Sequence, residues 1–173
     1  MAKYYERLIE KSIERKLRSS GAVVIEGPKC CGKITTALRY GKSNIRLNSL
    51  RTVELAKMET AKVLYGEKPR VIDEWQKVPE IWNEIKSWID ENPSFGQFIL
   101  TGRTTPADKS KILHSCAGRI STVKMRPMSL TESKNSNMTV SLTELFNDFN
   151  TNIYDENKES SLNKIAYYIC RGG

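Results

Sequence analysis

The sequence has few of the residues that build metal sites. Its 173 residues include one histidine, His114, and four cysteines that form no C-x-x-C pair. Structural zinc sites use three or four such ligands at short spacings, so the sequence indicates no zinc site. We expect the cysteines to be reduced, as they are in cytoplasmic proteins; they are Cys30, Cys31, Cys116 and Cys170.

Long hydrophobic runs are also missing. No stretch approaches the roughly 20 apolar residues that a membrane-spanning helix requires. The opening MAKYYERLIEKSIERK lacks the apolar region of a secretory signal. We therefore expect a cytoplasmic protein with no membrane partner.

Acidic residues are fewer than basic ones, 20 against 28, which gives a formal net charge of +8. No tract of five or more basic residues accompanies this excess. The charge is compatible with a nucleic-acid partner, but many basic enzymes have a similar charge. The composition, 39% hydrophobic and 28% charged, is typical of an ordinary globular domain.

The most informative stretch is AVVIEGPKCCGKITT, residues 22–36, in which an apolar run precedes a glycine-containing turn and a helix-forming segment. Two glycines with four residues between them, followed by lysine, are typical of the phosphate-binding loop known as Walker A. In such a loop, backbone N–H groups converge on an anion. We predict that this loop binds nucleotide phosphates through Gly27, Pro28, Lys29, Cys30, Cys31, Gly32, Lys33, Ile34 and Thr35.

Two acids follow the apolar pair of RVIDEWQ, residues 70–76, which we predict to be a strand like the Walker B strand of nucleotidases. In this interpretation Lys33 contacts the β- and γ-phosphates and Asp73 holds Mg²⁺ through water. Glu74 points differently and orients the attacking water. The alternative is that both acids merely end a strand with solvated charges.

Apolar spacing along the chain predicts alternating strands and helices. Strands are expected at 23–25, 44–47, 70–76, 97–101 and 119–125, and helices at 4–18, 33–40, 49–65, 79–91 and 108–113. This alternation predicts an α/β fold with a mainly parallel sheet and helices on both faces. Capping boxes at Ser129 with Glu132 and at Ser141 with Glu144 predict short helices there. We divide the chain into an N-terminal helix (1–20), a core (21–130) and a helical extension (131–173).

The segments GPKCCGKITTA, RVIDEWQ, QFILTGRTTPADK, HSCAGRI and KMRPMSLTES occur in this order. Together they resemble the AAA-type P-loop ATPases of bacteria and archaea, in which an ATPase domain precedes an uncharacterised C-terminal domain. The resemblance extends from about Tyr4 to the last residue. It implies a five-stranded P-loop NTPase sheet with an additional strand, a sensor at the polar end of the central strand, and ATP and Mg²⁺ as cofactors. It also implies that Arg119 is an arginine finger.

Three features depart from that family. Ile34 stands where Ser or Thr normally binds Mg²⁺, and Thr35 is rotated by about 100° around the helix, so its hydroxyl should not compensate. Phosphate binding can survive through Lys33 and the backbone, whereas we expect impaired hydrolysis. Arg103 replaces a small polar residue and either contacts the γ-phosphate or projects into solvent. The chain ends at Gly173, where the family continues, so we expect a truncated or degenerate product.

Three hypotheses for function follow. The first is an ATP-binding AAA-type domain with weak hydrolysis. The second is a basic module that binds nucleic acid, and the third is a non-catalytic subunit of a protein assembly, such as a homo-oligomer in which Arg119 acts on a neighbour.

Overall fold

The computed structural model describes residues 4–103, 118–136, 141–147 and 161–171. The chain divides into two units, one of Arg7–Arg126 and one of Met1–Glu6 with Pro127–Gly173. The helix expected at 108–113 lies outside the described residues. The division at residues 20 and 130 stays a prediction.

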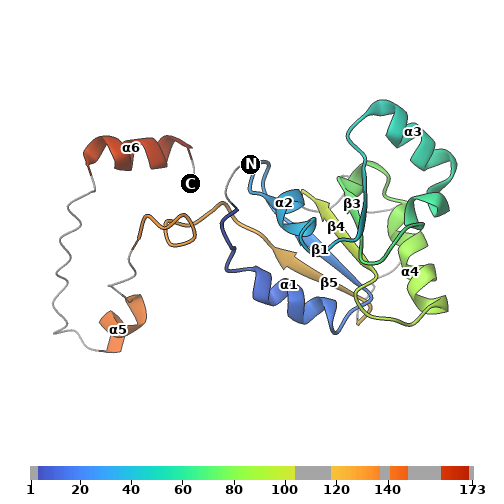
Figure 1. Ribbon diagram of the computed structural model, residues 1–173, viewed down its shortest axis with the longest axis horizontal. Coiled ribbons are helices and arrows are strands. Elements are labelled where there is room, and N and C mark those ends of the chain that lie inside the picture. Colours follow the sequence, from blue (N-terminus) through green and yellow to red (C-terminus); the bar gives the residue numbers. More distant parts are fainter. Residues whose placement is uncertain (1–3, 104–117, 137–140, 148–160, 172–173) are drawn as a thin grey trace. The chain divides into compact units, whose positions relative to one another are not determined.

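The larger unit is built on a five-stranded parallel sheet (Figure 1). Its strands are β1 (Ala22–Glu26), β2 (Ser43–Arg46), β3 (Arg70–Asp73), β4 (Phe98–Gly102) and β5 (Ile120–Lys124). Their order is β2-β3-β4-β1-β5, so β4 is an additional strand between β1 and β3. This confirms the predicted α/β fold. Because all strands are parallel, the loop after β1 and the two acids at the end of β3 lie at the same edge of the sheet.

Helices cover both faces of the sheet (Figure 1). One core cluster joins Ala22 and Val24 of β1 to α3 (Leu50–Met58), the 3-10 helix η1 (Thr60–Leu64) and α4 (Ile81–Glu91). The other joins Val23 and Ile25 to α1 (Glu10–Leu17) and α2 (Lys33–Ala37). Successive side chains of a strand point to opposite faces, so a strand buried on both faces is apolar throughout.

Several element ends differ from the predictions, among them those of α1, α3 and β3. The helix expected from residue 4 begins at Glu10, whose carboxylate accepts a hydrogen bond from the Arg7 backbone N–H at 2.7 Å. The helix expected over 49–65 is divided at Glu59, whose φ of −137° and ψ of 69° are not helical. Strand β3 ends at Asp73, because the backbone of Glu74 has a left-handed conformation (φ 59°). Glu74 directly precedes the short 3-10 helix η2 (Trp75–Lys77). That short helix buries Trp75 in the core.

The second unit contains two short helices, α5 (Leu142–Asn147) and α6 (Leu162–Arg171). The capping box predicted at Ser129 forms, with the Glu132 N–H donating to Ser129 Oγ at 3.2 Å, but the chain makes a turn there and not a helix. The Ser141 hydroxyl caps α5, as predicted, by accepting a bond from the Glu144 N–H at 3.4 Å. Among the described residues, no helix combines the length and the apolar character needed to cross a membrane.

Candidate functional site

The loop between β1 and α2 depends on two glycines. At Gly27, a Cβ atom would lie 2.1 Å from the Met125 carbonyl oxygen, so only glycine lets the two backbones approach so closely. Gly32 has a φ of 94° directly before α2, and Cys30 has a φ of 65°. Where residues in left-handed and right-handed backbone conformations alternate, successive backbone N–H groups form a concavity that can bind an anion.

Lys33 lies inside the curve of this loop. Its side chain is nearly buried, with a relative exposure of 7% for the residue. The ammonium donates to the carbonyl oxygens of Gly27 at 3.0 Å and Pro28 at 2.7 Å. These contacts hold a positive charge beside the loop.

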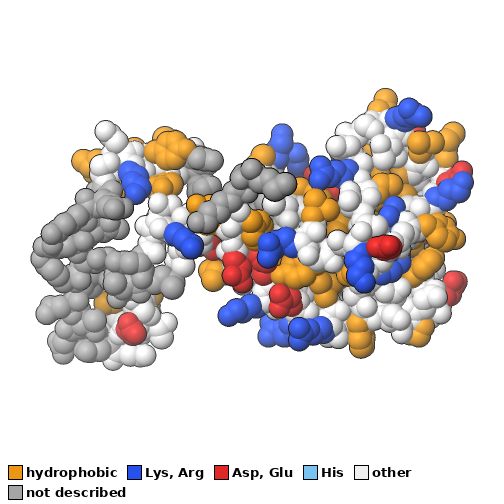
Figure 2. All heavy atoms as spheres, in the orientation of Figure 1, with side chains coloured by type: hydrophobic (Ala, Val, Ile, Leu, Met, Phe, Trp, Pro, Cys, Tyr) orange, Lys and Arg blue, Asp and Glu red, His pale blue; other side chains and the backbone are white. Residues whose placement is uncertain are grey.

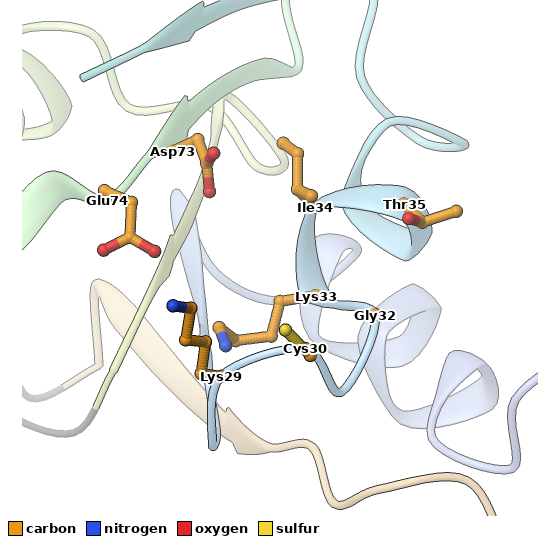
Figure 3. A pocket seen from close by; sticks show the side chains of 8 residues that line it. All are labelled: Lys29, Cys30, Gly32, Lys33, Ile34, Thr35, Asp73 and Glu74. Carbon is orange, nitrogen blue, oxygen red and sulfur yellow. The ribbon is translucent and has the colours of Figure 1, made fainter. Parts of the chain in front are cut away.

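A pocket of about 260 Å³ lies between the loop and the end of β3. Figure 3 shows the ammonium groups of Lys29 and Lys33 and the carboxylates of Asp73 and Glu74 facing one space. The structure therefore brings the predicted lysine and both predicted acids to one pocket. Its full lining is Lys29, Cys30, Gly32, Lys33, Ile34, Thr35, Asp73 and Glu74.

Three residues of the predicted loop set do not line this pocket. Cys31 is buried, with its sulfur 3.7 Å from the Met125 carbonyl oxygen. Gly27 and Pro28 line a different pocket and contribute their carbonyl oxygens to Lys33. These three residues support the loop, whereas the lining of the pocket comes from the loop residues around them.

The two acids are held by partners that the sequence reasoning did not name. Asp73 accepts a hydrogen bond of 2.5 Å from the hydroxyl of Thr101, its register partner on β4. Glu74 accepts a bond of 2.7 Å from Gln76, and its backbone N–H donates to the Thr101 carbonyl at 2.8 Å. Thr101 stands at the polar end of the central strand, where the resemblance implied a sensor. Gln76 belongs to the segment DEWQ, but its spacing gave no signal of this contact.

Ile34 lines the pocket and packs against the core cluster of α1 and α2. Thr35 is exposed, and Figure 3 shows its side chain directed away from Asp73, as the predicted rotation requires. Side-chain oxygens facing the pocket come from Asp73 and Glu74. Magnesium typically keeps several waters and takes one or two carboxylates plus substrate phosphates, so this donor set fits the ion without a direct hydroxyl ligand. Within the described residues, no group of three or more acidic, cysteine or histidine side chains could hold a metal.

Arg119 lies away from the pocket. It precedes β5 and pairs with Asp90 of α4, so it is at the opposite edge of the sheet from the loop. The five residues of β5 separate those edges by about 16 Å. Arg119 therefore does not reach the pocket of its own chain, and its predicted role as a finger requires a neighbouring copy.

A second pocket, of about 440 Å³, lies on the other side of Gly27 and Pro28. Arg103 lines this pocket together with Lys124 and Arg126, while Glu26 is the one acidic residue among the described residues of its lining. Arg103 does not line the pocket of Lys33 and Asp73. Arg103 is exposed, so the structure favours the second of the two roles considered for it, projection into solvent, and places it among other cations.

The sequence reasoning missed one residue that contacts the loop. Arg7, which lies within the helix expected at residues 4–18, is buried with a relative exposure of 5%. Its guanidinium donates to the carbonyl oxygens of Cys31 and Arg126, each at 2.8 Å. Nothing in its local sequence distinguishes it from the exposed Arg15 of the same segment.

The model of the AAA domain family matches residues 19–134 of the chain. The match includes the loop, both acids and all five strands. The search of curated proteins gives no match.

Proposed function

This chain belongs to the AAA domain family, and from that premise we propose that the pocket beside Lys33 binds ATP together with Mg²⁺. Membership makes this a nucleotide-binding domain of the AAA type. The identity of the nucleotide, the metal and the rate of hydrolysis belong to the proposal. One observation supports it most: Lys33, Asp73 and Glu74 line the same pocket at one edge of the sheet.

In the proposed complex, the loop surrounds the phosphates. Lys33 exchanges the carbonyls of Gly27 and Pro28 for the β- and γ-phosphate oxygens, and loop N–H groups bind the same anion. Lys29 adds a second ammonium at the rim. Bound Mg²⁺ would neutralise phosphate charge, and Asp73 would hold a water of its shell.

Hydrolysis is proposed to be slow. Glu74 is positioned to orient an attacking water once its carboxylate leaves the amide of Gln76. Ile34 offers no oxygen to the metal, so placement of Mg²⁺ is weaker than in a loop with Ser or Thr. The proposed arginine finger, Arg119, would have to act on the pocket of a neighbour, and a strict monomer with and without ATP in size-exclusion chromatography would contradict that part.

The test is a titration with labelled ATP, with and without Mg²⁺, of the natural sequence, Lys33→Ala and Lys57→Ala. Lys57 is an exposed lysine of α3, so Lys57→Ala removes the same charge at a position away from the pocket. We expect Lys33→Ala to weaken binding by at least about tenfold, because it removes charge-assisted hydrogen bonds to phosphate. Lys57→Ala should bind as the natural sequence does. An absence of saturable binding, or equal affinities in the two variants, would contradict the proposal.

A second candidate function, nucleic-acid binding, is favoured by the pocket that Arg103, Lys124 and Arg126 line. Against it, Figure 2 shows basic side chains of the larger unit interspersed with acidic ones on the face in view. Backbone phosphate contacts make affinity fall steeply as salt rises. An absence of DNA or RNA binding at low salt would exclude this candidate, and so would binding that Arg126→Ala leaves unchanged.

A further inference from the structure

Arg7 contacts the phosphate loop from outside its curve. One terminal guanidinium nitrogen donates to the Cys31 carbonyl and the second terminal nitrogen to the carbonyl of Arg126, which follows β5. The first of these nitrogens also lies 3.3 Å from where a Cβ of Gly32 would be. A buried guanidinium is costly unless its donors are satisfied, so these contacts define a specific location for the side chain.

The contact with the Cys31 carbonyl has a geometric consequence. A trans peptide group is planar, and its C=O and N–H bonds point in opposite directions. Holding the Cys31 oxygen toward Arg7 therefore turns the N–H of Gly32 away from Arg7, toward the pocket that Gly32 lines. That N–H is one of the loop donors available to an anion.

The segment that carries Arg7 also contacts residues that follow α2. The Glu10 carboxylate accepts hydrogen bonds from the Arg7 N–H at 2.7 Å and from the Tyr40 hydroxyl at 3.1 Å. It also pairs with Arg39, whose Nε lies 3.4 Å away. Residues before α2 and residues after it are thereby connected to one short segment that precedes the family match.

We propose that Arg7 is a positioning residue for phosphate binding, which holds the Cys31 carbonyl so that the Gly32 N–H faces the anion. This inference rests on the proposed function. It assigns a role in that site to a residue outside the matched domain. Arg7 touches the loop and not the nucleotide.

The experiment compares Arg7→Met with Arg15→Met, which removes the same charge from an exposed position on α1. The affinity for labelled ATP is measured by titration well below the unfolding temperature of each variant. We expect Arg7→Met to bind ATP about tenfold or more weakly than the natural sequence, because it loses charge-assisted hydrogen bonds to the loop. Arg15→Met should match the natural sequence. Arg7→Lys should be intermediate, because one ammonium replaces a forked donor.

Two readouts separate positioning from general stabilisation. Guanidinium ion at non-denaturing concentration should restore part of the affinity of Arg7→Ala, and it should leave Lys33→Ala unaffected. Alkylation of Cys31, which is buried, should accelerate in Arg7→Met relative to Arg15→Met, with the exposed Cys30 as internal reference.

The outcomes are distinguishable. If the natural sequence binds ATP, and Arg7→Met and Arg7→Lys both bind ATP as tightly as the natural sequence does, the inference is overturned while the proposed function stands. If the natural sequence binds no ATP, the proposed function fails. The alkylation rate of Cys31 then still tests whether Arg7 holds the loop, and an unchanged rate would overturn that contact as well.

Discussion

In the proposed function, the rate of ATP hydrolysis depends most directly on Ile34. It contributes to the pocket lining and to the core beneath it. The apolar side chain keeps its packing role, but it provides no oxygen for a metal. A nucleotide site with this substitution can retain phosphate binding, which relies on Lys33 and the loop backbone, while losing a ligand of the ion.

We predict that Ile34→Thr raises Mg²⁺-dependent ATP turnover. The matched control is Ile34→Val, which has nearly the shape of threonine but no hydroxyl. Restoring one ligand should increase the rate on the order of 10- to 100-fold over Ile34→Val, the range typical of groups that support a metal. Steady-state phosphate release at saturating ATP measures the effect, and equal rates in the two variants would show that the hydroxyl is not what limits hydrolysis.

At the scale of elements, the end of β3 separates the directions of the two acids. Asp73 is the last strand residue and pairs with Thr101, whereas Glu74 adopts a left-handed conformation and reaches Gln76. A strand continuing to residue 76, as the sequence predicted, would also have alternated these side chains. The observed turn achieves the separation differently and buries Trp75 as well.

Helix α4 stabilises the sheet from the face opposite α1 and α2. Its buried side, Ile81, Ile85 and Ile89, packs on the cluster that contains Val24, whereas Cys31 of the loop belongs to the other cluster. Damage to α4 should therefore reduce stability with little direct effect on the loop.

We predict that Ile85→Ala lowers the free energy of unfolding by about 2–5 kcal/mol, as for other large-to-small changes in a core. Ser87→Ala, an exposed position of the same helix, should change it by less than about 0.5 kcal/mol. Urea denaturation followed by circular dichroism measures both. ATP affinity at low temperature should be similar in the two variants, and a loss confined to Ile85→Ala would contradict the independence of the two faces.

At the scale of the whole molecule, Lys68 connects elements that lie apart in the sequence. Its ammonium donates to the Leu64 carbonyl at 2.6 Å and lies 3.6 Å from the ring centre of Phe98 and 4.7 Å from that of Trp88. Burial, with the nearby charge of Arg70, lowers the pKa of Lys68 to about 8. The folded protein therefore releases this proton more readily than the unfolded chain does.

A pH dependence of stability follows. Between pH 8 and about 10.4, the unfolded chain keeps the Lys68 proton that the folded chain has lost, so this residue makes stability rise with pH. Below pH 8 both states hold the proton and the contribution is constant. We expect the difference in unfolding free energy between the natural sequence and Lys68→Met to shift in favour of the natural sequence across this window. Urea denaturation at several pH values measures it, and a shift of opposite sign would contradict the lowered pKa.

The amino-acid sequence by itself determined the nature of the fold and the location of the loop that is proposed to bind phosphate. Apolar runs of a doubly buried sheet, helical spacing and a glycine-lysine turn are local patterns, and they predicted five strands and the residues around Lys33 and Asp73. The order of five motif segments along the chain gave the resemblance to the family. Each depends on neighbours within a few positions, where backbone geometry and side-chain periodicity act directly.

Only the tertiary structure decided which distant residues support the loop and which one lies away from it. Arg7 contacts carbonyls 24 and 119 positions further along the chain. Thr101 of β4 donates a hydrogen bond to Asp73 of the neighbouring strand β3. Arg119 has the right type of side chain, but it directly precedes β5 at the wrong edge of the sheet for the pocket of its own chain. Such pairings follow from strand order and direction, which arise when the whole sheet assembles, and no periodic pattern along the chain encodes them.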